Sequence, residues 1–369
     1  MPRLDERELI ADIKPELFLF ETDEINAETP AHFLDGDMTP AHLLFVRNTG
    51  RLPSIEHDDL TRWTLTIDGL VKAPQVFSLD RLRRDFPVVT QAAVLECAGN
   101  GRAYFTEPTS EPLWHQGAIG CVQWTGVRLA DLLQACGGPT DGAIYTAHHA
   151  PDENNEGDGP AISRGLPIAK ALAPETMVAF ALNGEPLPYL HGGPLRIVAP
   201  GFPGSAWQKW LTCIEIRDRE HDGERMTGSH YRMPRRPVQP GESLDDVAFD
   251  VITDMPVRSV ITSPADGFRI AADAAIEIRG HAWSGHVPVD HVDVSIDGGT
   301  TWRRASLATA QDPFAWRRFT IALDAPRGPV SILARATDVQ GHSQPLGSAP
   351  WNPRGYCNNA VHEVRGEMV

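Results

Sequence analysis

One cysteine in a glycine-rich turn is the residue best placed to do chemistry. Residues 95–102 read LECAGNGR, so Cys97 follows an apolar run and precedes two glycines and Arg102. Glycines allow the backbone to approach a bulky group closely. A nearby guanidinium favours the thiolate, which is the form that binds metals or attacks electrophiles. Two alternatives remain open at this point: a buried, inert cysteine, and the nucleophile of a cysteine hydrolase, for which no local protease signature is present.

Adjacent histidines give a weaker signal. His148 and His149 precede Asp152, a combination that could suggest a metal site. Neighbouring side chains in a chain point in different directions, however, so a solvated loop is the favoured interpretation.

Short elements must position Cys97. Residues 89–96 form an apolar run that predicts a strand ending at the cysteine. Residues 78–86 predict a short helix, because Ser78 is a good N-cap and the apolar residues Leu79, Leu82 and Phe86 share one face. Further strands are expected at 63–71, 143–147, 177–182 and 195–199, and helical segments at 128–136 and 166–172. This alternation predicts a mixed α+β domain.

The residue pattern changes in the last third of the chain. Residues 219–258 are polar and turn-rich, which indicates a linker. Beyond it, strand-like runs are separated by glycine turns, at 275–280, 289–297, 302–307, 317–323 and 330–337. Short strands at this spacing predict a β-sandwich. We therefore expect two domains, 1–250 and 251–369.

Composition limits the partners. The 369 residues carry 33 basic and 49 acidic side chains, a net charge of −16. Nucleic acids and anionic membranes require a basic face, so neither is expected as a partner. An enzyme for an anion would have to build a locally positive pocket inside this acidic shell.

Cysteine spacing and the N-terminus suggest a compartment. The five cysteines are widely spread and form no CxxC pair, so a zinc ribbon, a thioredoxin-like site and covalent haem attachment lack support. No apolar run approaches the roughly 18 residues of a membrane span. Residues 1–7 lack the apolar core of a leader peptide. As written, the chain is expected to be cytoplasmic; a leader removed before residue 1 would instead make it periplasmic.

Several motifs together resemble one family. The LECAGNGR segment resembles the molybdenum-ligating segment of the sulfite oxidase family. Similar motifs follow in the family's order: FVRN at 45–48, NGEPLP at 183–188, HGGPLR at 191–196, KWL at 209–211, AWSG at 282–285, DGG at 297–299 and WNPRG at 351–355. The resemblance implies a molybdopterin domain followed by an immunoglobulin-like β-sandwich that pairs two chains as a homodimer.

The resemblance also implies a cofactor site. Cys97 would be the protein ligand of molybdenum in a molybdopterin cofactor, and soft sulfur ligands suit such a metal. His191 and Arg196 would hold the pterin phosphate, and Lys209 would complete the cradle. The full set of expected cofactor-binding residues is Phe45, Val46, Arg47, Asn48, Cys97, Asp152, His191, Arg196, Ser205, Trp207, Gln208 and Lys209.

The implied reaction is oxidation of sulfite to sulfate. Arg47, Arg102 and Arg317 match the family's substrate positions, and clustered guanidiniums can replace the hydration of a dianion. Trp114 matches a pocket tryptophan. Keeping Arg317 favours sulfite over nitrate. No haem domain is recognised in the chain, so electrons would leave to a separate acceptor such as a cytochrome c or oxygen.

Two departures from the family pattern are expected. Phe180 aligns with the active-site tyrosine and Thr49 with a common histidine, so both positions lose a polar contact near the cofactor. Slower turnover, a different oxyanion, or rescue by another group such as Tyr104 or His115 are all open. These losses leave two alternatives open. The first is an enzyme of the same fold acting on nitrate, a sulfoxide or a reduced sulfur compound. The second is a protein that binds the cofactor without turnover.

Overall fold

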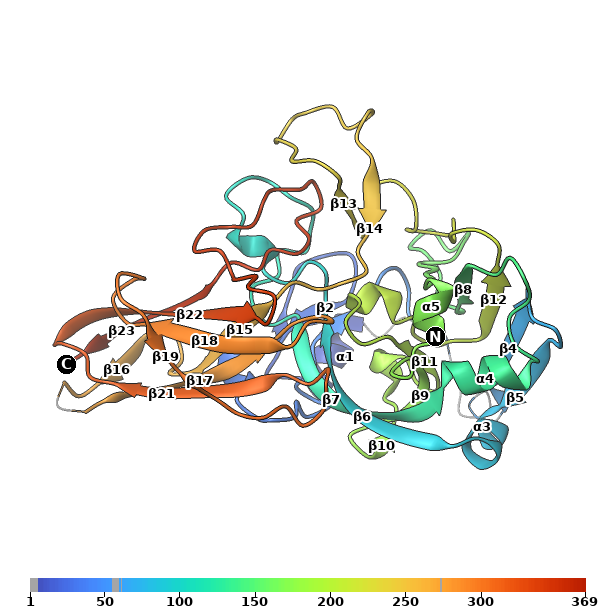
Figure 1. Ribbon diagram of the computed structural model, residues 1–369, viewed down its shortest axis with the longest axis horizontal. Helices are drawn as coiled ribbons and strands as arrows, with labels where there is room; N and C mark the ends of the chain where they lie inside the picture. Colours follow the sequence, from blue (N-terminus) through green and yellow to red (C-terminus); the bar gives the residue numbers. More distant parts are fainter. Residues whose placement is uncertain (1–5, 55–59, 61, 273) are drawn as a thin grey trace.

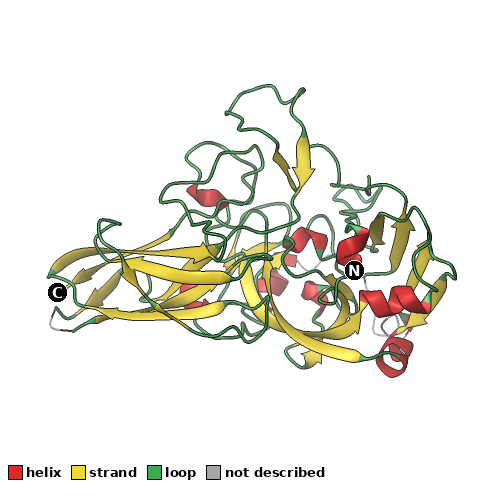
Figure 2. Cartoon of the chain, in the orientation of Figure 1, coloured by secondary structure: helices red, strands yellow, loops and turns green. Residues whose placement is uncertain are grey.

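The structure is a computed structural model that describes residues 6–54, 60, 62–272 and 274–369. Residues 1–5, which contributed to the expectation about a leader, lie outside the described part. Figure 1 shows an N-terminal part with short helices and several sheets, and an elongated C-terminal part built of strands. Figure 2 shows the same division by secondary structure. The fold is thus an α+β domain followed by a β-sandwich, as the sequence predicts.

The N-terminal part alternates short elements. Its helices and 3₁₀ turns are α1 (Glu6–Ile13), η1 (Ala31–Leu34), α3 (Leu79–Asp85), η2 (Arg102–Tyr104), α4 (Leu129–Ala135), α5 (Ile168–Ala171), η3 (Tyr189–His191) and η4 (Gly204–Ala206). Its strands are β1 (Phe18–Leu19), β2 (Asn26–Glu28), β3 (Val46–Arg47), β4 (Thr64–Gly69), β5 (Gln75–Ser78), β6 (Val88–Glu96), β7 (Ile119–Arg128), β8 (Tyr145–His149), β9 (Met177–Leu182), β10 (Glu185–Pro186), β11 (Arg196–Val198) and β12 (Cys213–Arg217).

Two sheets make up most of the first domain. One has the order β10-β9-β7-β6 with β11 paired to β9, and the other has the order β5-β4-β12-β8. Ser78 caps α3 as expected, because its side chain accepts a hydrogen bond from the Arg81 backbone. The prediction that His148 lies in a solvated loop is wrong. His148 is buried in β8 and its Nε2 lies 2.8 Å from Thr146 Oγ1.

The expected linker contains structure. A hairpin of β13 (Arg232–Pro234) and β14 (Phe249–Val251) projects from the body in Figure 1. The sandwich that follows consists of β15 (Arg258–Ser263), β16 (Phe268–Ile270), β17 (Ile276–Trp283), β18 (Val289–Ser295), β19 (Arg303–Arg304), β20 (Ser306–Leu307), β21 (Arg317–Leu323), β22 (Gly328–Asp338) and β23 (His362–Met368). The single strand expected at 302–307 is therefore two short strands.

The sandwich has two sheets, ordered β15-β17-β21-β20 and β16-β23-β22-β18-β19. Its core is apolar and fully enclosed, as burial of alternating side chains from two facing sheets requires. It contains, among others, Ile278, Val292, Phe319, Ile332 and Val364.

The sandwich packs directly on the strands that lead to Cys97. Val94 of β6 donates a backbone hydrogen bond to Phe314 across 2.9 Å. Ile119 of β7 shares a buried cluster with Val260 and Trp283 of the sandwich. The two domains are therefore joined beside the cysteine turn. Within the described residues, no helix is both long enough and apolar enough to cross a bilayer.

Candidate active site

The Cys97 turn is fixed from both sides. The Cys97 backbone N–H donates to the Ala118 carbonyl across 3.0 Å, and the Cys97 carbonyl accepts from the Asn100 N–H across 2.9 Å. Gly99 cannot be replaced without movement, since a Cβ there would lie 2.4 Å from the guanidinium of Arg102. The sequence thus presents one thiol on a turn with little freedom.

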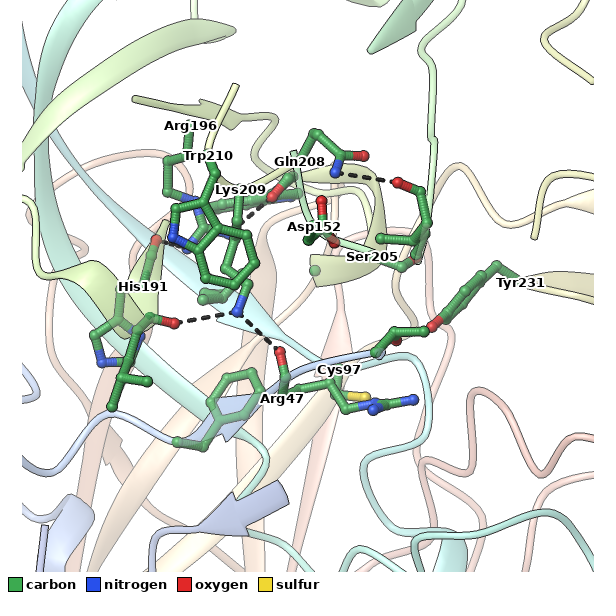
Figure 3. Close-up of a pocket in the computed structure, with 17 residues that line it drawn as sticks. Arg47, Cys97, Asp152, His191, Arg196, Ser205, Gln208, Lys209, Trp210 and Tyr231 are labelled. Atoms are coloured by element: carbon green, nitrogen blue, oxygen red, sulfur yellow. Dashed lines mark hydrogen bonds between the residues drawn. The ribbon is translucent and has the colours of Figure 1, made fainter. Parts of the chain in front are cut away.

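The thiol opens into a cavity that brings together most of the predicted cofactor residues (Figure 3). The predicted residues that line it are Phe45, Arg47, Cys97, Asp152, His191, Arg196, Ser205, Trp207, Gln208 and Lys209. Two predicted residues lie outside the lining. Val46 packs in a buried apolar cluster, and Asn48 accepts a hydrogen bond from the Lys209 ammonium through Oδ1.

Two buried cations form one wall of this cavity. The Arg196 guanidinium donates to the carbonyls of His191 and Trp207 across 2.8 and 3.0 Å. The Lys209 ammonium donates to the carbonyl of Leu190 across 3.1 Å. Burial lowers the pKa of Arg196 to about 9 and the pKa of Lys209 well below its ordinary value. Burying a cation is costly unless an anion faces it, so this wall suits a bound dianion.

A second cavity adjoins the first at Cys97. Arg47, Cys97 and Tyr231 line both. We call this second cavity the anion pocket. It is also lined by Arg102, Ser110, Glu111, Trp114, Arg225, His230, Arg354 and Tyr356. Four arginines and one carboxylate, that of Glu111, therefore line the cavity that Cys97 opens into. This excess of basic side chains provides the locally positive pocket that an enzyme for an anion needs inside an acidic protein.

Each guanidinium is held differently. Arg47 pairs with Glu24 Oε2 at 2.5 Å and donates to Asn26 Oδ1 across 3.0 Å. Arg102 donates to the Pro112 carbonyl across 2.8 Å. Although burial opposes the charge of Arg47, nearby groups that include Glu24 raise its pKa above the ordinary value. Arg102 differs, because burial lowers the pKa of its guanidinium, although the nearby Cys97 opposes this. Both side chains are held in place by these hydrogen bonds.

Comparison with known proteins decides the family. The model named "Oxidoreductase molybdopterin binding domain" matches residues 50–225, and "Mo-co oxidoreductase dimerisation domain" matches residues 249–368. The chain is 31% identical over 351 residues to the sulfite oxidase of Gallus gallus, covering 91% of this chain and 75% of that protein. The chain belongs to the sulfite oxidase family.

The chain is also similar to other proteins. The mitochondrial sulfite oxidase of Mus musculus is 33% identical over 363 residues, which cover 93% of this chain but only 64% of the mouse protein. The chain therefore spans less than two thirds of that relative. The crystal structure of the sulfane dehydrogenase SoxCD from Paracoccus pantotrophus matches with a TM-score of 0.80 and 29% identity. That match covers 96% of this chain and 88% of the SoxCD chain.

The cavity suits the molybdenum cofactor of this family. Several buried polar atoms in it have no hydrogen-bond partner: His191 Nε2, Asp152 Oδ1 and Ser205 Oγ. Buried polar atoms are nearly always paired, so these atoms mark where a polar ligand binds. Burial also raises the pKa of Asp152 to about 6. The sulfur of Cys97 and the basic side chains of Arg196 and Lys209 line the same cavity, a set that matches a group with a soft metal at one end and a phosphate at the other.

The sequence-based prediction for Arg317 is wrong in its placement. Arg317 begins β21 opposite Ala282, and its guanidinium donates to the carbonyls of Ala308 and Val289 across 2.7 and 2.6 Å. It lines a separate cleft of the sandwich and neither cavity at Cys97. The sandwich contributes Arg354 instead. The WNPRG motif at 351–355 could have indicated Arg354, because this motif resembles the family, but no role was predicted for its arginine.

Phe180 is likewise not in the site. It lies in β9 and its ring packs under the Arg83 guanidinium, 5.2 Å from the ring centroid, in a different cleft. The tyrosine of the site is Tyr231, whose hydroxyl points toward Cys97 and Arg47 in Figure 3. Tyr231 was not among the predicted site residues, because it lies in residues 219–258, which were interpreted as a linker.

The structure also places Thr49, Trp114 and the two residues considered as substitutes for the lost polar contacts, Tyr104 and His115. Thr49 lines the cofactor cavity, whereas Tyr104 and His115 line neither cavity. His115 instead pairs with Glu28 at 2.5 Å. Trp114 lines the anion pocket as predicted and is fully buried. With Tyr231 in the pocket, no substitute for a missing hydroxyl is needed.

Proposed function

We propose that this chain oxidises sulfite to sulfate with a molybdenum cofactor bound at Cys97. The observation that carries the proposal is the convergence of Arg47, Arg102 and Arg354 on a pocket that shares Cys97 with the cofactor cavity. When bound, the cofactor supplies a two-electron acceptor beside the pocket.

The residues of the chain handle the anion. Sulfite carries about two charges and loses its water on entering a closed site, and fixed guanidiniums replace that hydration. The buried Trp114 ring helps to exclude bulk water from the pocket, which strengthens these electrostatic contacts. The Tyr231 hydroxyl is available as a hydrogen-bond donor on the side of the pocket that faces Cys97.

Different residues would bind the two ends of the cofactor. Arg196 and Lys209 would bind the phosphate end, with His191 and Ser205 donating further hydrogen bonds. Cys97 would hold the metal end through its thiolate. The distance between these groups is set by β6 and by the 196–209 segment, so the chain fixes both ends of the cofactor before substrate arrives.

The proposal also covers the pairing of chains, the electron acceptor, the domain bounds and the location. The two chains of a homodimer would pair through residues 251–369, whose sandwich we take to be immunoglobulin-like. The match to a dimerisation domain supports this pairing. Electrons would pass to a separate acceptor such as a cytochrome c or oxygen. We keep the division into 1–250 and 251–369 and a cytoplasmic location, with a periplasmic one if a leader was removed.

The test is metal analysis of the purified protein together with sulfite-dependent reduction of ferricyanide. We expect about one molybdenum per chain by the single-thiolate scheme, activity in the parent, and loss of activity in Cys97→Ser. Cys213→Ser, a cysteine on β12 away from both cavities, is the matched control and should keep activity.

Other outcomes would redirect the assignment. Molybdenum without sulfite oxidation, but with turnover of nitrate, a sulfoxide or a reduced sulfur compound, would contradict sulfite as substrate and keep the cofactor. Molybdenum without turnover of any of them would indicate a cofactor-binding protein. Absence of molybdenum from protein made in a host that supplies the cofactor would overturn the whole proposal.

A further inference from the structure

Arg354 reaches the anion pocket from the other domain. It lies in the segment between β22 and β23, where Gly355 N–H donates to the Asn352 carbonyl and Asn352 Nδ2 donates to the Tyr356 carbonyl, each across 2.9 Å. These bonds fix the backbone on both sides of Arg354. They leave the direction of its long side chain undetermined.

Two residues just before Tyr231 fix that direction. Arg354 Nε donates to Ser229 Oγ across 3.1 Å, and its terminal nitrogen lies 2.9 Å from His230 Nε2. Both partners belong to the segment that the sequence analysis interpreted as a linker. The contact therefore joins the sandwich to the residues that place the Tyr231 ring.

These partners can carry no negative charge. Burial lowers the pKa of His230, and Arg354 and Arg225 lower it further, against the weaker opposite effect of Glu224. The neutral imidazole accepts a hydrogen bond through Nε2. Arg47 differs, because the carboxylate of Glu24 pairs with it at 2.5 Å and partly neutralises it.

The difference matters for an anion site. A guanidinium held by a carboxylate shares its charge between that carboxylate and the substrate. A guanidinium held by a hydroxyl and a neutral imidazole keeps its whole charge for the substrate. Arg47, Arg102 and Arg225 line the same pocket as Arg354, and their like charges oppose its placement there. The hydrogen bonds to Ser229 and His230 offset this repulsion.

We propose that His230, together with Ser229, is a positioning residue that holds the Arg354 guanidinium in the anion pocket without neutralising it. The inference rests on the proposed function, because it assigns the held charge to an oxyanion. It adds a contact between domains that acts on substrate affinity rather than on the redox step.

The experiment compares His230→Ala and His230→Gln in the molybdenum-loaded protein. Gln can accept the bond from Arg354, whereas Ala cannot. We expect KM for sulfite to rise about tenfold in His230→Ala, with kcat within about twofold, because one hydrogen bond to a charged group is lost. His230→Gln should recover most of the affinity. His342→Ala, an exposed histidine of the sandwich, is the control and should match the parent.

A second readout does not depend on turnover. Calorimetric titration with sulfate should show a Kd raised about tenfold in His230→Ala and about as much in Ser229→Ala. An unchanged sulfate Kd in both variants would overturn the positioning role. So would equal losses in kcat for the Ala and Gln variants, which indicate a general structural defect. If the parent binds sulfate through this contact but oxidises no sulfite, the positioning role stands and the proposed reaction fails.

Discussion

The indole Nε1 of Trp283 donates a hydrogen bond to Glu96 Oε2 across 2.8 Å. Trp283 ends a sandwich strand, and Glu96 immediately precedes Cys97. Arg258 of the sandwich pairs with Glu96 Oε1 at 3.1 Å, and Asn100 donates to the same oxygen across 3.0 Å. The residue before the thiol is therefore held by the second domain. The side chains of Arg258 and Glu96, which form this ion pair, are both almost fully buried.

The first prediction concerns this buried pair. Arg258→Met leaves the Glu96 carboxylate enclosed without its cation, so we expect the free energy of unfolding to fall by about 3–5 kcal/mol. Chemical denaturation followed by circular dichroism measures it. Arg269→Met is the control, since its pairing with Glu367 is exposed and should change stability by less than about 1 kcal/mol. Equal losses in the two variants would contradict the argument.

The second prediction separates Tyr231 from Phe180. Tyr231→Phe keeps the ring, which stacks on Tyr356 with centroids 5.4 Å apart, and removes only the hydroxyl. We expect kcat to fall about ten- to a hundredfold, as for loss of one hydrogen bond to a charged group in the transition state. Phe180→Tyr should leave steady-state kinetics unchanged, because it lies in another cleft. Higher turnover in Phe180→Tyr would restore the sequence-based assignment.

The third prediction separates the two arginines of the sandwich. Arg354→Met removes a cation from the anion pocket, so KM for sulfite should rise about ten- to a hundredfold. Arg317→Met removes a cation that bonds only carbonyls in a separate cleft, and its KM should equal that of the parent. Initial rates over a range of sulfite concentrations give both values. A raised KM in Arg317→Met alone would reverse our correction.

The fourth prediction is a pH dependence of stability. The pKa of His115 is raised, first by its hydrogen bond to Glu28 and also by that carboxylate's charge, although burial opposes this. The contribution of the pair is fully present below the unfolded-state pKa of about 6.5 and is lost as pH rises through the higher folded-state value. The side chain of His115 is half exposed, so the effect stays below about 1 kcal/mol.

Its measurement is the difference in unfolding free energy between the parent and Glu28→Gln. We expect this difference to be larger at about pH 5.5 than at about pH 8.5. A difference that grows with pH would show that the charged form of His115 is not the stabilised one.

The sequence predicted the parts of the site that rest on local patterns. Cys97 lies at the end of an apolar strand, and the HGGPLR and KWL motifs brought His191, Arg196 and Lys209 to the cavity because their spacing is set within short segments. Arg354 and Tyr231 were missed for a shared reason. Each reaches the site through packing between distant segments, which no periodicity in the chain encodes.

Phe180 was predicted in the site but lies outside it, and the reason is again packing that the sequence pattern does not encode. It lies in the apolar run 177–182, which was predicted as a strand and forms β9 with almost every side chain buried. The face it occupies depends on how β9 pairs with β7 and β11, and that pairing turns its ring toward Arg83. A sheet register that shifts by one residue reverses the facing of every side chain. Alignment of motifs alone could not settle it.

The arrangement of Arg354 suggests how substrate choice could diversify in such proteins. Apart from Tyr231, the residues that line the cofactor cavity lie within 45–210, whereas one cation of the anion pocket comes from the loop between two sandwich strands. A change in that loop could alter which oxyanion is accepted while the metal-binding turn keeps its sequence. The second domain would then act as an exchangeable selectivity module on a constant redox core.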